Sequence, residues 1–258
     1  MEFAPGAARD NGLIKFHRDT DIRRQYWPEN VFKHPAKYNI HMLCAIVEYL
    51  TTPGQTILDC MAGTGTTMMA AVLGRNVILL EVEEKYHEMQ LYVQNKLDSI
   101  RDDNTGSIMT LIGDCRKFLP IPADCVIFSP PYADMLKRKS VSGIAAEDSS
   151  SLSELVDYSK YIWNIGNYNY FMYCHMMEPV YEKLCQSAPL MAIVVKDRYK
   201  NQERVQFVQD NIDTAVKVGW TLQEHIIFKP QGTEFVNIQK AMGFKAVEDE
   251  SIVIFRRK

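Results

Sequence analysis

Several patterns that mark common classes of protein are missing from this sequence. None of its six cysteines stands in a Cys-x-x-Cys pair, and no His-Glu-x-x-His occurs, so neither kind of zinc site is expected. No run of apolar residues approaches the roughly 18 that would span a membrane, and the N-terminus has no apolar signal core. We therefore expect a reduced, cytoplasmic protein that does not enter a membrane.

An excess of basic residues is also missing, because 29 lysines and arginines stand against 32 acids and give a net charge of −3. The overall field therefore offers nucleic acid no attraction, and such a partner would have to be held by local basic patches. Apolar residues make up 47% of the chain, which is enough to fill a sizeable core. At 258 residues, one domain with insertions is expected, and two small domains are the alternative.

Short apolar runs alternate with stretches of helical periodicity from residue 40 onward. Strands are expected at 56–59, 76–81, 107–114, 124–129, 190–197, 220–228 and 250–258. Helices are expected at 40–50, 65–73, 84–97, 168–186 and 203–217. Continuous apolar strands separated by helices are typical of a largely parallel α/β sheet that is covered on both faces. Ligands of such sheets lie across the carboxyl ends of the strands.

Two segments depart from this alternation. Residues 1–33 are polar and charged with weak periodicity, and we expect them to form an irregular N-terminal arm. A long polar segment at 133–167 has a serine-rich centre and is expected to be an insertion in a domain of 34–258. This insertion is a candidate for target recognition. Alternatively, its tryptophan and tyrosines pack against the sheet.

A glycine turn follows the first expected strand, in the segment LDCMAGTGTT. Asp59 ends the strand, and Gly63 and Gly65 form the turn. Thr66 and Thr67 can cap the helix that follows, and Thr66 is also a candidate cofactor-binding residue. A dinucleotide fingerprint would need a third glycine three residues after Gly65, and a phosphate-binding P-loop would need a lysine; neither is present. The turn suits a cofactor that carries an amine and a ribose, although a turn that merely needs glycine is the alternative.

Acidic residues end the next two expected strands. Glu81 lies 18 residues after Gly63, close to the spacing at which an acid takes ribose hydroxyls, and Asp114 ends the third strand. Each of these acids alone could be a solvated loop residue. Together with Asp59 they favour a nucleoside-like cofactor with an amino-acid tail, which is S-adenosylmethionine.

The segment FSPPY at 128–132 resembles the catalytic motif of the DNA amino-methyltransferases, which methylate an exocyclic base nitrogen. The segment ILDCMAGTGTT is similar to their cofactor motif, although Cys60 and Met61 replace the usual Pro-Phe. The segment HPAKYN resembles their N-terminal cofactor motif, which implies that His34 and Pro35 contact the cofactor.

Further matches to this family are LLEVEEKYHEM, NIGNYNYFMYCHMMEPVYEKL, VVKDRYK and EDESIVIFRRK, so the resemblance covers roughly 34–258 apart from the insertion. It implies a Rossmann-like class I methyltransferase fold. In that fold a mostly parallel, doubly wound sheet has an antiparallel last strand. The resemblance also implies S-adenosylmethionine as cofactor and methyl transfer to a flipped base.

The chemistry of such a transfer explains the Ser-Pro-Pro-Tyr corner. An exocyclic amine is a poor nucleophile, because its lone pair is delocalised into the ring. The Ser129 hydroxyl and the Pro130 carbonyl can accept the amino hydrogens, and the two prolines, including Pro131, hold that carbonyl rigidly. Tyr132 offers a ring on which an extruded base can stack. A rigid turn that only covers the sheet is the alternative.

Two basic clusters follow strand ends and could contact phosphates. The first holds Lys137, Arg138 and Lys139, and the second holds Lys196, Arg198 and Lys200. Solvated loop charges are an equally good interpretation of each residue taken singly.

We therefore hypothesise a site-specific DNA methyltransferase of a restriction-modification type. It would act in the cytosol or nucleoid of a microbe or virus-infected cell, and a homodimer stays open. The resemblance favours cytosine N4 as the target, because a serine at the start of the corner is similar to the cytosine-N4 group, and adenine N6 is the alternative. No Pro-Cys pair is present, so carbon-5 methylation is not expected. Rival hypotheses are an RNA or protein-glutamine amino-methyltransferase and a cofactor-binding regulator without catalysis.

Overall fold

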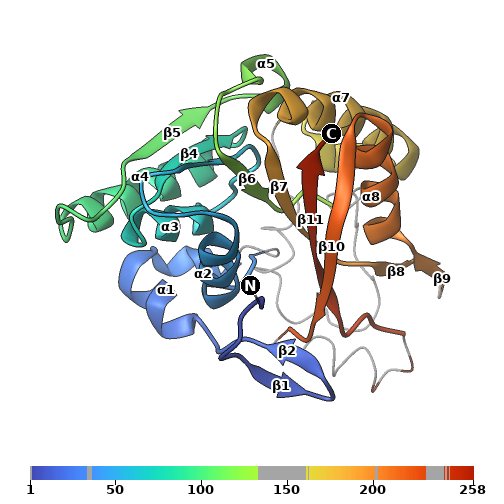
Figure 1. The fold of residues 1–258 in the computed structure, drawn as a ribbon, viewed down its shortest axis with the longest axis horizontal. Coiled ribbons are helices and arrows are strands. Elements are labelled where there is room, and N and C mark those ends of the chain that lie inside the picture. Colours follow the sequence, from blue (N-terminus) through green and yellow to red (C-terminus); the bar gives the residue numbers. More distant parts are fainter. Residues whose placement is uncertain are drawn as a thin grey trace, which may run out of the picture.

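The computed structural model describes residues 2–33, 37–132, 161, 163–200, 203–230, 241, 243 and 245–258. Its main sheet has nine strands in the order β1-β2-β10-β11-β7-β6-β3-β4-β5 (Figure 1). These strands are β1 (Ala8–Asp10), β2 (Leu13–Lys15), β3 (Thr56–Asp59), β4 (Asn76–Glu81), β5 (Ile108–Ile112), β6 (Cys125–Phe128), β7 (Leu190–Val195), β10 (Trp220–Phe228) and β11 (Glu250–Arg257). Two further strands, β8 (Arg198–Lys200) and β9 (Glu203–Val205), form a separate hairpin.

The α-helices are α1 (Thr20–Tyr26), α2 (Ile40–Leu50), α3 (Met69–Val72), α4 (Glu84–Asp98), α5 (Cys115–Phe118), α7 (Tyr170–Ser187) and α8 (Phe207–Lys217). Three 3-10 turns are η1 (Glu29–Lys33), η2 (Thr66–Met68) and η4 (Ile165–Asn167). None of the described helices combines the length and the apolar character that crossing a bilayer requires.

Strand direction follows the expected pattern. Strands β3 to β7 run parallel to one another, and β11 inserts antiparallel between β7 and β10. The prediction of a mostly parallel, doubly wound sheet with an antiparallel last strand is confirmed. All the parallel strands therefore end on one edge, where their loops can share a site.

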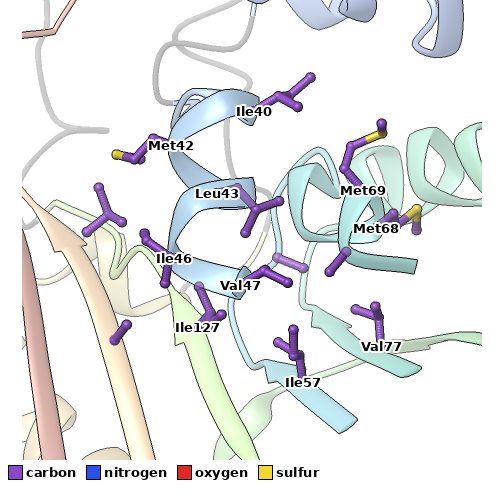
Figure 2. Close-up of a cluster of buried hydrophobic side chains, with 14 of the residues drawn as sticks. Ile40, Met42, Leu43, Ile46, Val47, Ile57, Met68, Met69, Val77 and Ile127 are labelled. Atoms are coloured by element: carbon purple, nitrogen blue, oxygen red, sulfur yellow. The ribbon is translucent and has the colours of Figure 1, made fainter. Parts of the chain in front are cut away.

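The sheet is covered on both faces, because successive residues of its central strands point to opposite sides. Ile57 contributes to the core under α2 and α3, whereas its neighbour Leu58 contributes to the core under α7 and α8. Figure 2 shows the first of these cores, in which Leu43 and Val47 of α2 lie over the strands. Each buried Leu or Val contributes about 1.5–3 kcal/mol relative to an exposed one.

The expected irregular arm is wrong as a description of residues 2–33. This segment holds β1, β2 and α1, and β2 pairs with β10 at the edge of the main sheet. Its apolar side chains Phe3, Phe16, Trp27 and Val31 are buried in the core. The strands have three residues each, which is too short for a periodic signal.

The first helix braces the glycine turn through Arg23 and Trp27, which are both buried. The Arg23 guanidinium donates to Asp19 (2.9 Å), to the Tyr38 carbonyl (2.8 Å) and to the Thr66 hydroxyl (3.3 Å). The Trp27 indole N–H donates to the carbonyl of Thr64 (2.7 Å). The turn is therefore supported from outside the parallel sheet.

Replacing Arg23 with alanine is expected to lower the free energy of unfolding by about 2 kcal/mol, because buried acceptors lose their donor. Urea denaturation measures this change. The matched control is Arg24→Ala on the same helix, where an exposed pair with Asp21 (3.4 Å) adds little. Equal losses in the two variants would contradict a bracing role for Arg23.

Candidate active site

One cavity lies at the carboxyl ends of β3, β4, β5 and β6 and collects most of the predicted catalytic and cofactor-binding residues. Its lining includes Gly63, Thr66, Glu81, Asp114, Ser129, Pro130, Pro131 and Tyr132. Lys37 and Tyr38, which precede α2, complete another part of the wall. The glycine turn and the Ser-Pro-Pro-Tyr corner therefore face a common space.

Asp59 lies behind the glycine turn and is fully buried. Its Oδ1 accepts from the Met61 amide (3.1 Å), and its Oδ2 accepts from the hydroxyls of Tyr38 (3.2 Å) and Thr67. Burial raises the pKa of Asp59 to about 6 despite these donors. Asp59 is not part of the cavity lining among the described residues, so its geometry fits a residue that shapes the turn.

The turn needs glycine at Gly65, whose φ is +80°. A Cβ there would lie 2.9 Å from Cγ of Gln90, which itself donates to the Gly63 carbonyl (2.7 Å). The expected capping role of Thr66 is wrong. Gly65 occupies the N-cap position, and the Thr66 hydroxyl accepts from Arg23 instead.

Replacing Gly65 with alanine is expected to lower the free energy of unfolding by about 1–2 kcal/mol from backbone strain, with a further loss from crowding. The matched control is Gly54→Ala, since Gly54 also has a positive φ (+89°) but open space around it. Chemical denaturation of both variants measures the difference. A Gly54→Ala loss as large as that of Gly65→Ala would contradict the tight packing of the turn on α4.

Glu81 presents a fixed carboxylate at the end of β4. Its Oε2 accepts from the Gly63 amide (2.6 Å), and its Oε1 accepts from the amides of Val82 (2.9 Å) and Glu83 (2.8 Å). Burial raises the pKa of Glu81 to about 7, although the three amides oppose the shift. A carboxylate has about four acceptor sites, so Oε2 keeps a lone pair for a ligand hydroxyl.

Asp114 follows β5 and is held by Arg116. It caps α5 by accepting from the Arg116 amide (3.0 Å), and it accepts two bonds from the guanidinium (2.7 and 2.9 Å). Burial acts to raise the pKa of Asp114, but the bonds and charge of Arg116 outweigh it and lower the pKa. Asp114 is therefore an ionised wall of the cavity.

The Ser-Pro-Pro-Tyr corner presents an acceptor and a ring. The Ser129 hydroxyl donates to the Val194 carbonyl of β7 (2.8 Å), so the lone pairs of its oxygen stay available as acceptors. The Tyr132 ring packs on Phe207, with centroids 5.2 Å apart and planes 32° apart. Burial raises the pKa of Tyr132, which keeps its phenol neutral.

Several predicted residues lie away from this cavity or cannot be placed. Lys196 pairs with Glu250 (3.5 Å), while Arg198 and Lys200 begin and end β8. Five residues named in the sequence lie outside the described part of the chain: His34, Pro35, Lys137, Arg138 and Lys139. The same holds for most of the insertion at 133–167.

Other residues of the cavity were not predicted. Glu83 and Arg116 each follow a predicted acid by two positions, so their closeness in sequence to Glu81 and Asp114 could have identified them. Lys37 and Asn164 also line the cavity, although both are far in sequence from the strand ends that form the rest of it. Burial and the nearby charge of Arg23 lower the pKa of Lys37 to about 8, so its amine is still mostly cationic at neutral pH.

Comparisons with known proteins relate part of this chain to DNA methyltransferases. Residues 15–92 match the family of DNA methylases known as N6_N4_Mtase, so the match begins within the segment expected to be an arm. A 57-residue stretch is 40% identical to the Type II methyltransferase M.BglI of Bacillus subtilis. That stretch spans 22% of this chain and only 16% of that protein.

Solved structures share the fold at low identity. Magnesium protoporphyrin IX methyltransferase of Synechocystis, with bound S-adenosylhomocysteine, has a TM-score of 0.51, 12% identity and coverage of 93% of this chain and 100% of that one. A proposed RNA methyltransferase of Pyrococcus horikoshii has a TM-score of 0.50, 16% identity and coverage of 84% and 81%. The fold is thus that of the class I methyltransferases, and the sequence matches confirm that this chain resembles the DNA amino-methyltransferases.

Proposed function

We propose that this protein transfers a methyl group from S-adenosylmethionine to an exocyclic amine of a DNA base. The observation that carries the proposal is the single cavity shared by the glycine turn, Glu81 and the Ser-Pro-Pro-Tyr corner. A cofactor and an acceptor can be held side by side in such a cavity. The DNA methylase match at residues 15–92 supports the same reading.

The residues at the cavity fit the cofactor. Glu81, with one lone pair left, suits a ribose hydroxyl, and the tight turn at Gly63 allows the backbone to approach a ligand. Asp114 and Thr66 lie on the same wall. When bound, S-adenosylmethionine supplies a methyl group on a positively charged sulfur.

The corner would bind and orient the amine. Ser129 Oγ and the Pro130 carbonyl accept the amino hydrogens, which turns the nitrogen lone pair away from the base ring. Tyr132, held on Phe207, stacks on the extruded base. The nitrogen would gain the methyl group as the bond between that methyl group and sulfur breaks, which would leave S-adenosylhomocysteine, and it would then lose one proton to solvent. Preorganised acceptors of this kind act without reorganising during the reaction.

Cytosine N4 is the proposed target, with adenine N6 as the alternative, because the corner begins with serine. DNA would be the partner in the cytoplasm. Lys196, Arg198 and Lys200 would contact phosphates together with the cluster at 137–139. The insertion at 133–167 would contribute to target recognition.

The test is transfer of a tritiated methyl group to duplex DNA, with tRNA and a protein mixture as parallel acceptors. Single-molecule sequencing of DNA from cells that express the chain then identifies the base and its site. We expect label in DNA, at cytosine N4. Label in tRNA or protein alone would favour the RNA or glutamine alternatives. Cofactor binding without transfer to any acceptor would favour a regulator.

A further inference from the structure

Four consecutive residues of the cavity wall come from an unexpected place in the sequence. Trp163, Asn164, Ile165 and Gly166 line the cavity, although they belong to the end of the segment expected to serve target recognition. Asn164 is only 8% exposed, and Ile165 is buried as well. This part of the segment is thus built into the cavity beside the strand-end acids.

The Asn164 side chain joins this wall to the end of β4. Its Nδ2 donates to Glu83 Oε1 (2.7 Å), and its Oδ1 accepts from the amide of Gly166 (3.0 Å). Glu83 is 3% exposed, and its own amide donates to Glu81 Oε1 (2.8 Å). One chain of hydrogen bonds therefore leads from Asn164 through Glu83 to Glu81.

A second bond joins the same wall to the end of β5. The Arg116 guanidinium donates to the Trp163 carbonyl (2.9 Å) while it also holds Asp114 (2.7 Å). Glu81 and Asp114 are thus tied, through one intermediate residue each, to neighbouring positions of one short segment. Loss of that segment would remove one support from each of the two residues, Glu83 and Arg116, that contact these acids.

We infer that Asn164 is a positioning residue for the nucleoside part of the cofactor, acting through Glu83 on Glu81. The inference deepens the proposed function and rests on it for the identity of the ligand. Buried carboxylates need hydrogen-bond donors, and an amide that uses both of its groups fixes one orientation of Glu83. The residues 163–166 therefore serve the cofactor, whatever the rest of the insertion recognises.

The experiment measures binding of S-adenosylhomocysteine to the full chain by calorimetry. Asn164→Ala is expected to raise the Kd about tenfold, since a hydrogen bond to a buried charge is lost. The matched control is Asn167→Ala, on the same turn, whose side chain donates to the Tyr161 carbonyl (2.8 Å) and does not line the cavity. The control is expected to bind within about twofold of the unchanged protein.

The isosteric variant Asn164→Asp provides a second test that does not depend on whether Asn164→Ala folds. Its new carboxyl would face the Glu83 carboxylate, near Glu81, Asp114 and Arg116 of the adjoining strand ends. At pH 8 we expect a Kd at least tenfold above that of the unchanged protein. At pH 5.5 the new carboxyl can take up a proton and donate to Glu83, so the ratio of the two Kd values should fall toward one. A role confined to packing would leave that ratio independent of pH.

Tryptophan fluorescence supplies a second measurement of ligand binding. Trp163 lines the cavity and is 47% exposed, whereas Trp27 and Trp220 are buried. Unchanged affinity in Asn164→Ala, or an equal loss in Asn167→Ala, would overturn the inference. S-adenosylhomocysteine binding involves no acceptor, so failure of methyl transfer to DNA would leave this result standing. Failure of the unchanged protein to bind would instead remove the cofactor assignment itself.

Discussion

Replacing Ser129 with alanine is expected to lower kcat for methyl transfer about hundredfold and to leave the affinity for S-adenosylhomocysteine within about twofold. Ser129 commits its proton to the Val194 carbonyl (2.8 Å), so its oxygen can only accept from a group in the cavity. Removing one preorganised hydrogen-bonding group from a reaction centre costs roughly 10²–10³ in kcat. Single-turnover transfer of a tritiated methyl group measures the effect.

The matched control is Ser251→Ala. Ser251 is a serine of β11 whose hydroxyl pairs with His225 Nε2 (2.8 Å), and it does not line the cavity. It should retain full kcat. If Ser129→Ala also bound S-adenosylhomocysteine more weakly, Ser129 would be assigned to cofactor binding and not to binding of the amine. An unchanged kcat would remove it from the chemistry.

The parallel part of the sheet was predictable from sequence, because strands buried on both faces read as continuous apolar runs. The bounds expected for β3, β4 and β10 are those of the structure. The helix expected at 203–217 instead begins at Phe207, since residues 203–205 pair with β8. That hairpin depends on a pairing which periodicity cannot reveal.

The residues of the candidate site also divide into those that the sequence predicted and those that it did not. Glu81, Asp114 and Ser129 were predicted together, because parallel strands bring their carboxyl ends to one edge. Asn164 and Arg23 were missed, because their roles depend on hydrogen bonds to partners 81 and 43 residues away. Such contacts leave no local pattern in a single sequence.

Replacing Glu81 with glutamine is expected to raise the Kd for S-adenosylhomocysteine about hundredfold at pH 8. A hydrogen bond from a ribose hydroxyl to a buried charge is worth about 1.5–3 kcal/mol, and glutamine would lose that charge. Glutamine would also turn an N–H group toward one of the amides of Gly63, Val82 or Glu83 that now donate to the carboxylate. Calorimetry measures the Kd, and Glu88→Gln, an exposed change on α4, controls for the loss of charge.

The pH dependence gives a sharper form of this prediction. The pKa of Glu81 is raised to about 7, so the folded protein without ligand favours the neutral carboxyl more than the unfolded chain does. The contribution of Glu81 to stability therefore decreases as the pH rises from about 4.5 to about 7. A bound ribose hydroxyl favours the carboxylate instead, so S-adenosylhomocysteine should bind more tightly as the pH rises through about 7. Between pH 8 and pH 6 we expect the Kd to increase about tenfold.

In Glu81→Gln this slope should be lost, because no group at position 81 can titrate. Asp59, with a pKa of about 6, and Lys37, with a pKa of about 8, are present in both proteins. Any slope that they cause therefore remains in the variant and is subtracted by the comparison. Equal slopes in the two proteins would assign the pH dependence to Asp59 or Lys37 and would contradict a ribose-binding role for the Glu81 carboxylate.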